Sequence, residues 1–354
     1  MTITNVIADW YLENARKLPW RETKDPYKIW LSEVILQQTQ IKQGLPYYMS
    51  FVDRYPTVYD LAQAREEEVL KLWQGLGYYS RARNLLKAAQ KVVKQFDGVF
   101  PKNYKTLLTL PGVGDYTASA VASICYEEPV AVLDGNVFRV LARYYGIDTP
   151  INSTEGRKLF KQRAEQILDK KQPGEHNQGV MEFGALQCSP KSPNCQICPL
   201  KETCFAFQNG RVSTLPVKLK KVKIRKRYLN YLVFSTPEED LIIRKRSKKG
   251  IWQNLYEFPL IESTRIMSAK TLSDTEEMKA IEYIMEKTPV AFYSKEKKHQ
   301  LTHQILYIKF WLISVSQEDA LKMAADKGYK IVSNEMIHDF PVPVVIQNFL
   351  EDFI

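Results

Sequence analysis

Four cysteines within a short stretch place the strongest constraint on how this chain can fold. They occur as Cys188-x6-Cys195-x2-Cys198-x5-Cys204, so that four of the five cysteines fall within 17 residues. An odd, clustered set in a long chain is not the pattern of a secreted disulfide framework. It indicates a metal centre with four thiolate ligands, and both zinc and a four-iron cluster accept such a set.

The spacing of the cysteines separates these two metals. Ligand type alone favours zinc, but zinc ribbons more often carry two paired C-x2-C units than an x6-x2-x5 arrangement. The spacing resembles that of the iron–sulfur glycosylases, the superfamily of endonuclease III and MutY. The resemblance implies a structural 4Fe-4S cluster bound by Cys188, Cys195, Cys198 and Cys204. Redox sensing by the cluster is the alternative role.

Periodicity divides the chain into a helical and a mixed region. Asp25 can cap a helix whose first turn holds Pro26, and apolar spacing extends that helix over 27–41. Further helices are predicted at 67–73 and 80–96. After a basic linker at 207–226 the pattern becomes α+β, with strands expected at 228–234, 241–243 and 304–313 and helices at 274–286 and 342–353.

Charge and hydropathy point to the kind of partner. The 354 residues carry a net charge of +10, and the sequence pI is about 9.1. This balance favours an anionic partner such as nucleic acid. The sequence has neither a signal-peptide pattern nor an apolar run of the length that a membrane helix needs. We therefore expect a soluble, cytoplasmic protein without a membrane partner.

A glycine-containing turn precedes another predicted helix. Leu108-Thr109-Leu110-Pro111-Gly112-Val113-Gly114 leads into Asp115. Gly112 and Gly114 permit a tight turn and leave amide N–H groups free to bind a DNA phosphate at the helix N-terminus. On its own the segment is equally typical of a plain tight turn. It becomes more specific because Asp134, in Val132-Leu133-Asp134-Gly135-Asn136, follows 20 residues after Gly114.

Together these segments resemble the helix–hairpin–helix glycosylase superfamily over residues 15–205. Asp134 matches the catalytic aspartate of that superfamily, although an isolated Asp-Gly-Asn can be a simple helix cap. Glu33 alone would suggest a surface residue, but the string Trp30–Gln40 resembles the MutY segment that carries a catalytic glutamate. Tyr116 stands where bifunctional relatives carry a lysine, so Schiff-base strand cleavage is not expected.

The resemblance implies excision of adenine opposite 8-oxoguanine or guanine in double-stranded DNA by a monomer. Glu33 would act as general acid on the flipped base, and Asp134 would stabilise the oxocarbenium-like sugar. Tyr116 and Asn136 would position these groups and the attacking water. Gln38, Leu76, Gly77 and Tyr78 match positions that wedge into the duplex, although Gly75–Tyr79 could be an ordinary helix–helix loop. Arg16, Trp20, Arg21 and Gln178 match the surroundings of the adenine pocket, and Ser80, Arg81, Arg83 and Asn84 are candidate phosphate contacts.

The C-terminal half resembles the MutT-like (Nudix-like) domain with which MutY senses 8-oxoguanine. Gly250-Ile251-Trp252 and Tyr256-Glu257-Phe258-Pro259 carry this resemblance. The clustered glutamates of a Nudix hydrolase are missing, so pyrophosphate hydrolysis is not expected. The family's recognition loop typically reads Phe-Ser-His, whereas this chain has Leu301-Thr302-His303. The hydroxyl and imidazole are kept, but the aromatic wedge becomes aliphatic. His303 alone would be an ordinary surface histidine.

The expected fold is therefore multidomain. An all-α helix–hairpin–helix glycosylase with an Fe–S cluster loop covers 1–206, divided into a six-helix module at about 21–126 and an Fe–S module at about 1–20 and 127–206. The basic linker at 207–226 precedes an α+β Nudix-like domain at 227–354. Three other functions stay open: a thymine–uracil mismatch or pyrimidine-lesion glycosylase on the same scaffold, a non-catalytic DNA-binding protein, and a redox sensor.

Overall fold

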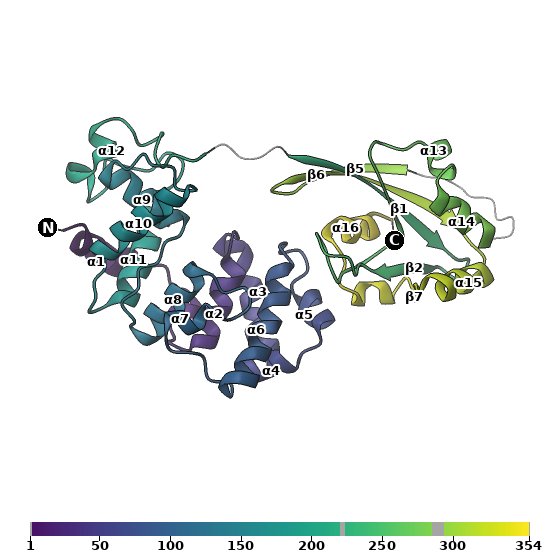
Figure 1. Cartoon of the computed structure of the whole chain (residues 1–354), viewed down its shortest axis with the longest axis horizontal. Helices are drawn as coiled ribbons and strands as arrows, with labels where there is room; N and C mark the ends of the chain where they lie inside the picture. Colours follow the sequence, from purple (N-terminus) through teal and green to yellow (C-terminus); the bar gives the residue numbers. More distant parts are fainter. Residues whose placement is uncertain (1, 220–223, 285–293, 354) are drawn as a thin grey trace. The chain divides into compact units, whose positions relative to one another are not determined.

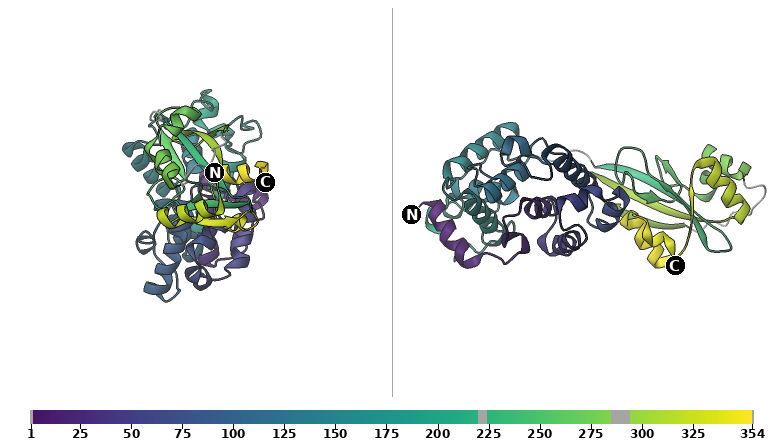
Figure 2. Two further views of the ribbon diagram at one scale, coloured as in Figure 1. Left: turned by 90° about the vertical axis from the view of Figure 1, so that its right-hand side faces the viewer. Right: turned by 90° about the horizontal axis from the view of Figure 1, so that it is seen from below.

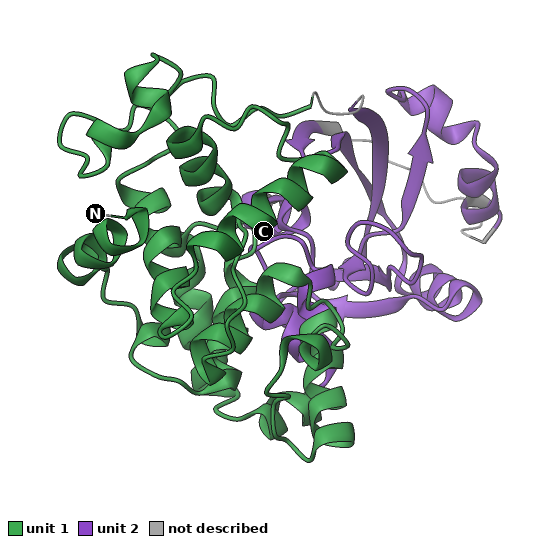
Figure 3. Cartoon of the chain, turned by 60° about the vertical axis from the view of Figure 1, so that its left-hand side comes forward, with its two compact units in different colours: residues 1–64, 84–220 green, residues 65–83, 221–354 purple. Residues whose placement is uncertain are grey.

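The computed structural model describes residues 2–219, 224–284 and 294–353. The chain forms two compact units, shown in green and purple in Figure 3. Unit 1 comprises residues 1–64 and 84–220, and unit 2 comprises 65–83 and 221–354. This division differs from the sequence-based boundaries in two respects. Residues 65–83 join the C-terminal residues, and the expected linker at 207–226 is divided between the units, with 207–220 in unit 1.

All secondary-structure elements assigned in the described residues of unit 1 are helices, as the sequence predicted. The α6 helix (Ser80–Phe96) begins in unit 2 and runs on into unit 1. The other helices of unit 1 are α1 (Ile3–Asn14), η1 (Pro19–Arg21), α2 (Pro26–Leu36), α3 (Ile41–Arg54), α4 (Val58–Gln63), α7 (Tyr104–Leu107), α8 (Asp115–Tyr126), α9 (Gly135–Tyr145), α10 (Thr154–Ile167), α11 (Pro173–Leu186), η2 (Lys201–Thr203) and α12 (Phe205–Gln208). Figure 1 shows them in purple to teal.

The first turn of α2 follows the expected capping chemistry. The Asp25 side chain accepts a hydrogen bond from the Tyr27 amide at 2.9 Å, and Pro26 occupies the first helical position. The single helix predicted over 27–41 is wrong, because α2 ends at Leu36 and α3 begins at Ile41. Between them Gln38 has a φ of 57°. This left-handed conformation is unfavourable for a residue other than glycine and cannot continue an α-helix.

The interior of unit 1 brings distant segments together. Ile7 of α1, Leu141 of α9, Phe160 of α10 and Phe183 of α11 belong to one buried cluster. Cys188, Cys198 and Cys204 pack partly buried against the same cluster. The cysteine loop is thus supported by the core that also carries the helix following Asp134. None of the helices in the described ranges is both long and apolar enough to cross a membrane.

Unit 2 is built on a mixed sheet, which confirms the predicted α+β pattern. Its described strands form a seven-stranded sheet with the order β3-β2-β1-β6-β5, while β4 pairs with β1 and β7 with β2. The strands are β1 (Arg225–Ser235), β2 (Asp240–Lys245), β3 (Tyr256–Glu257), β4 (Leu260–Ser263), β5 (Ser294–Gln300), β6 (Gln304–Ser314) and β7 (Lys330–Ser333).

The central ladder of this sheet is parallel. β1 and β6 pair over eleven residues, from Arg225 opposite Gln304 to Ser235 opposite Ser314, and Figure 2 shows the two ribbons running together. The helices of unit 2 are α5 (Glu66–Leu72), α13 (Ala269–Ser273), α14 (Glu276–Ile284), α15 (Gln317–Lys327), η3 (Met336–Asp339) and α16 (Val344–Phe353). The end of the helix predicted at 274–286 lies outside the described residues.

Candidate active site

Glu33 and Tyr116 form the centre of the candidate site. Glu33 lies on α2 with only 8% of its surface exposed, which is unusual for a carboxylate. The hydroxyl of Tyr116, from the first turn of α8, donates a hydrogen bond to Glu33 Oε2. The same hydroxyl lies 3.7 Å from the sulfur of Met181 on α11. Two residues that were proposed from separate segments of the sequence are therefore in direct contact.

Asp134 is held in place by the helix that follows it. Its Oδ1 accepts hydrogen bonds from the amides of Asn136 and Val137, both at 2.8 Å, at the N-terminus of α9. The Asn136 side-chain amide donates to Oδ2 at 2.7 Å. The capping role and the proposed catalytic role are compatible, because three donors and the helix dipole favour the ionised carboxylate.

Burial opposes the ionisation of both carboxyl groups, but they differ in the hydrogen-bond donors that favour the charged form. Burial raises the pKa of Glu33 to about 7; the hydrogen bond from Tyr116 lowers it, and the negative charge of Asp134 raises it. Burial also raises the pKa of Asp134, and hydrogen bonds from Val137 and Asn136 offset only part of that rise. The pair therefore suits a proton donor near neutral pH beside a carboxylate with dedicated donors.

A third buried carboxylate, missed at the sequence level, organises the proposed base pocket. Glu182 on α11 accepts bidentate hydrogen bonds from Arg16, at 2.6 and 2.7 Å, and from Arg21, at 2.8 and 2.9 Å. Burial disfavours its charge, but these arginine contacts outweigh burial and lower the pKa of Glu182 to about 2. The sequence did hold a signal for Glu182, because it lies four residues after Gln178 and therefore on the same face of a helix as that pocket candidate.

The remaining predicted pocket residues lie near this ion cluster or in the core. Gln178 Oε1 accepts a hydrogen bond from the Tyr11 hydroxyl at 2.9 Å, and the Arg21 guanidinium lies 5.7 Å from the centre of the Tyr11 ring. Trp20 is 7% exposed and packs edge-on against Tyr48. Arg16, Arg21 and Gln178 are thus joined through shared contacts, whereas Trp20 contributes a buried wall.

Arg139 connects the catalytic candidates with the cysteine loop, and sequence inspection did not single it out. Its guanidinium donates to Asn136 Oδ1 at 2.9 Å and to the Cys188 carbonyl at 2.7 Å. It also donates to the carbonyl of Gly184. Since Asn136 holds Asp134, one buried arginine links the proposed catalytic carboxylate to the first cysteine of the motif.

The four motif cysteines line one cavity, together with Arg143 and Phe183 among others. They form no disulfide, and no group of three or more potential ligands lies at metal-binding distances within the described ranges. Arg143 donates to Cys188 Sγ at 3.4 Å and to the carbonyl of Ser189 at 2.8 Å. Four free thiols that face one space and a fixed cation beside them fit a four-cysteine metal cluster.

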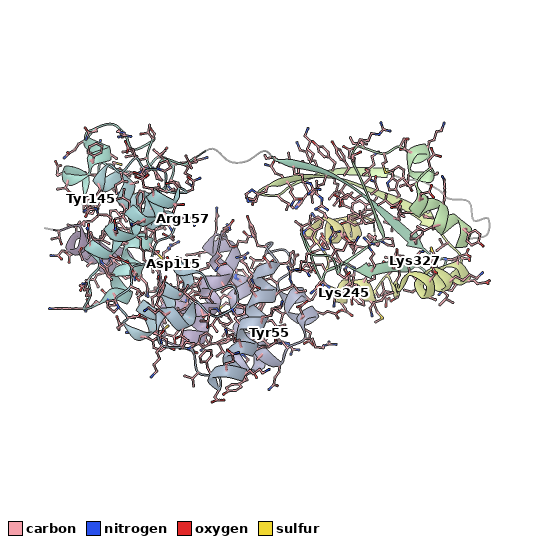
Figure 4. All side chains as sticks on the ribbon, viewed as in Figure 1. Tyr55, Asp115, Tyr145, Arg157, Lys245 and Lys327 are labelled. Atoms are coloured by element: carbon pink, nitrogen blue, oxygen red, sulfur yellow. The ribbon has the colours of Figure 1, made fainter. Side chains whose placement is uncertain are left out.

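The glycine turn before α8 has the geometry expected of a backbone anion site. Gly112 has a φ of +74°, and an added Cβ would lie 2.7 Å from the Cβ of Asn84, so this position requires glycine. Gly114 caps α8 in an extended conformation without a side-chain cap. Asp115 follows it, as labelled in Figure 4. Asn84, proposed as a phosphate contact, packs beneath this turn.

In unit 2 the proposed wedge and lesion-reading residues meet. Tyr78 is 44% exposed and has a φ of 49°, and its hydroxyl forms a hydrogen bond with the hydroxyl of Thr302. Leu301, Thr302 and His303 form the turn between β5 and β6, closed by a bond from the Leu301 amide to the Gln304 carbonyl at 2.8 Å. Segments more than 200 residues apart in sequence thus share one surface.

Leu76, Gly77 and Arg83, which were also proposed as wedge or phosphate contacts, are less exposed than Tyr78. Gly77, with a φ of 75°, accepts a hydrogen bond from the Trp73 indole. Leu76 is only 5% exposed and lies in the core. Arg83 donates to the Gln253 carbonyl at 2.8 Å. The structure therefore presents Tyr78, rather than Leu76, at the surface of this turn.

Comparison with known proteins identifies both parts of the chain. Residues 31–166 match the HhH-GPD superfamily of base excision DNA repair proteins, and residues 230–352 match the NUDIX domain. The adenine DNA glycosylase of Buchnera aphidicola subsp. Schizaphis graminum is 34% identical over 358 residues, covering 99% of this chain and 98% of the relative. That of Buchnera aphidicola subsp. Baizongia pistaciae is 37% identical and covers 87% and 85%.

A solved structure supports the fold of the helical region. A thermostable thymine-DNA glycosylase is 30% identical, with a TM-score of 0.54, and covers 58% of this chain and 95% of that protein. The expected combination of a helical glycosylase with a Nudix-like domain is confirmed by the family matches and this fold. The chain therefore belongs to the adenine DNA glycosylase family and is an adenine-specific DNA glycosylase.

Proposed function

We propose that this enzyme removes adenine paired with 8-oxoguanine or guanine in double-stranded DNA, by hydrolysis and without cutting the strand. The observation that carries the mechanism is the buried Glu33, with a pKa of about 7, hydrogen-bonded to Tyr116. A carboxyl group that keeps its proton near neutral pH can donate it to a leaving group.

The reaction begins with the adenine outside the base stack, because its glycosidic bond is inaccessible inside the duplex. Glu33 donates its proton to ring nitrogen N7 of the adenine. The C1′–N9 bond then breaks, and its electron pair stays with the base, which leaves as neutral adenine. Protonation matters because the unprotonated purine anion is a poor leaving group.

Asp134 acts on the sugar. Loss of the base leaves positive charge on the sugar ring, and the ionised carboxylate stabilises that charge or bonds to C1′ transiently. A water then adds to C1′, any bond between C1′ and Asp134 breaks, and the proton of the water passes to the Glu33 carboxylate, so that the product is an abasic site in an intact strand. Asn136 keeps the Asp134 carboxylate in place through its 2.7 Å hydrogen bond.

The absence of a lysine amine at Tyr116 supports a monofunctional enzyme. A tyrosine hydroxyl cannot form a Schiff base with the sugar, so strand cleavage by that route is not available at this position. Base recognition is assigned to the pocket around Arg16, Arg21 and Gln178, with Trp20 as a wall and Glu182 fixing the two guanidinium groups.

Duplex binding is assigned to three places. The backbone amides beside Gly112 and Gly114 bind a phosphate at the start of α8. Gln38 and Tyr78, both with positive φ, enter the duplex, and such strained residues are concentrated at functional sites. In unit 2 the Leu301–His303 turn reads the base opposite the adenine.

The cysteine cavity would hold a 4Fe-4S cluster through Cys188, Cys195, Cys198 and Cys204. When bound, this group cross-links its four thiolates and so fixes the loop that they span. Arg143 holds the same loop through the carbonyls of Ser189 and Pro190. We further propose that the enzyme acts as a monomer in the cytoplasm.

The test is adenine release under single-turnover conditions from duplexes with adenine opposite 8-oxoguanine or guanine. Strand breaks are scored before and after alkali. The proposal expects release by the wild type, severe loss in Glu33→Gln and Asp134→Asn, and breaks only after alkali. Tyr126→Phe on α8 is the matched control, because it loses only a hydrogen bond to the Phe100 carbonyl. Release that survives in Glu33→Gln would refute the acid assignment.

A further inference from the structure

A cavity of about 460 Å³ in unit 2 adjoins the residues assigned to lesion reading. Tyr78, Thr302 and His303 line it, together with Trp252 and His299. Its volume is in the range of small-molecule sites, about 300–1,000 Å³. Neither Trp252 nor His299 has a part in the function proposed so far.

The two additional side chains form an aromatic wall. The rings of Trp252 and His299 lie 6.2 Å apart between centroids, at an angle of 44°. Trp252 is 7% exposed, so most of its ring packs within the protein while part faces the cavity. Flat aromatic faces of this kind contact nucleic-acid bases by stacking or edge-on packing.

The backbone that carries Trp252 is strained. Gly250, Trp252 and Asn254 have φ values of 140°, 59° and 67°. A positive φ is rare for tryptophan, and such conformations persist only where surrounding contacts enforce them. The turn begins just after β2, whose last residue, Lys245, is labelled in Figure 4.

A buried ion pair holds this turn from within unit 2. Glu257 has no side-chain exposure and binds Arg246 at 2.8 Å. The Nε of Arg246 donates a hydrogen bond to the Ile251 carbonyl at 3.0 Å. The backbone carbonyl of Arg246 accepts a hydrogen bond from the Asn254 amide at 2.8 Å. Arg246 therefore fixes the peptide on each side of Trp252.

Helices α5 and α6 hold the turn from its other side. The Arg83 guanidinium donates to the Gln253 carbonyl at 2.8 Å, and the Asn254 side-chain amide donates to Glu66. Trp252 is thus fixed relative to the segment that presents Tyr78. Trp252 thus has a strained backbone, lies on a cavity wall, and sits in a turn that is hydrogen-bonded both by Arg246 and by residues of α5 and α6. Packing alone does not account for this combination.

We propose that Trp252 is a specificity-determining residue whose indole ring packs against the oxidised purine opposite the adenine, with Arg246 as its positioning residue. This inference rests on the proposed function. The 8-oxoguanine base has a carbonyl at C8 and an N–H at N7, whereas guanine has a C–H and an acceptor there. The indole wall restricts how a purine sits, so that this edge meets the Thr302 hydroxyl, which can accept from N7–H.

The first measurement compares single-turnover adenine release from the 8-oxoguanine and guanine duplexes. Trp252→Leu keeps apolar volume but removes the aromatic face. We expect it to lower the 8-oxoguanine-to-guanine rate ratio at least about fivefold, with the rate on guanine duplexes nearly unchanged. Trp252→Phe should keep most of the ratio. Tyr283→Leu, which changes an aromatic residue of unit 2 that is 89% exposed, should keep all of it.

Arg246→Lys tests the positioning role. It should lower the same ratio, and the double variant with Trp252→Leu should lose little more than Trp252→Leu alone, because both act through one contact. Additive losses, or equal losses on both duplexes, would overturn the assignment. An unchanged ratio in Trp252→Leu with wild-type thermal stability would also overturn it.

A binding measurement separates this inference from the proposed chemistry. In the Glu33→Gln background, tryptophan emission is followed as the 8-oxoguanine and guanine duplexes bind, with and without Trp252→Phe. We expect a larger change with 8-oxoguanine that Trp252→Phe abolishes. A change that persists in Trp252→Phe refutes the inference even if adenine release is normal. Failure of the wild type to release adenine refutes the proposed reaction, while the binding comparison still decides the role of Trp252.

Discussion

Replacing Tyr116 with phenylalanine should move the alkaline limb of the glycosylase pH profile to higher pH. In the proposed mechanism the rate requires protonated Glu33, so the wild-type rate should fall as pH rises through about 7. The Tyr116 hydroxyl donates to the ionised carboxylate and thereby lowers the pKa of Glu33. Without that donor the protonated form persists to higher pH.

The size of the shift follows from the lost hydrogen bond. A hydrogen bond to a charged group contributes about 1.5–3 kcal/mol, and one pKa unit corresponds to about 1.4 kcal/mol. The midpoint of the limb should therefore rise by about one to two pH units. The maximal rate should fall as well, because the proposed mechanism also uses Tyr116 to position the reacting groups, but the midpoint is independent of that amplitude.

The assay is single-turnover adenine release from the 8-oxoguanine duplex, quenched with alkali, at half-unit steps between pH 5.5 and about 9.5. Tyr126→Phe, on the same helix, should keep the wild-type midpoint because its hydroxyl bonds only the Phe100 carbonyl. A midpoint in Tyr116→Phe that stays in place or moves to lower pH would show that Tyr116 does not stabilise the Glu33 carboxylate.

Four further substitutions test other parts of the structure. Glu33→Gln should stabilise the fold by up to about 3 kcal/mol at pH 8, and this gain should vanish near pH 4.5. The reason is that the raised pKa of Glu33 makes its buried carboxylate destabilising only at higher pH. Urea unfolding at both pH values measures the free energy of unfolding. Glu182→Gln should lower the free energy of unfolding by about 3 kcal/mol at pH 7, and by progressively less as pH falls toward 2. The lowered pKa of Glu182 means that its charged form contributes its full stability above pH 4.5. An equal loss of stability at pH 3 would contradict the role of the ion pair. Arg143→Gln should speed the loss of iron from the proposed 4Fe-4S cluster to a chelator, because it removes charged donors from the cysteine loop. The iron content of the protein over time measures this loss. Gly112→Ala should weaken duplex binding by about 1–2 kcal/mol through left-handed backbone strain, and binding titrations at two salt concentrations would detect it.

Much of the fold follows from local signals. The Asp25–Pro26 start of α2 and the α6 helix were predicted from short segments, because capping chemistry and apolar spacing are local properties. The helix cap formed by Asp134 had been considered only as an alternative to a catalytic role, and the structure shows it. The prediction that the helix continues through Gln38 was wrong because it, too, relied on local spacing alone. Its apolar spacing remained helical, but the backbone there is held in a left-handed conformation that periodicity does not record.

Candidate site residues could be proposed where a family motif supplied the position. Glu33, Asp134 and the cysteines were proposed in this way, and the structure places Glu33 and Tyr116 in direct contact. Glu182 and Arg139 were missed because they bind residues far away in the sequence. Glu182 binds Arg16 at a separation of 166 positions, and Arg139 binds the backbone carbonyl of Cys188 at a separation of 49. A glutamate or arginine within a helix usually faces solvent, and only tertiary packing shows that these two are buried.

The parallel pairing of β1 with β6 has a consequence for how the chain reaches its folded state. The paired residues are 79 positions apart, from Arg225 to Gln304, so the central ladder of the sheet closes a long loop. Such non-local pairing is slow compared with helix packing. During synthesis the helices before residue 220 can assemble before β6 exists. β2 and β4 can already pair with β1 at that stage, but the edge of β1 that pairs with β6 stays open to aggregation until β6 has left the ribosome. The repair enzyme should therefore depend most on chaperones after its catalytic helices have already formed.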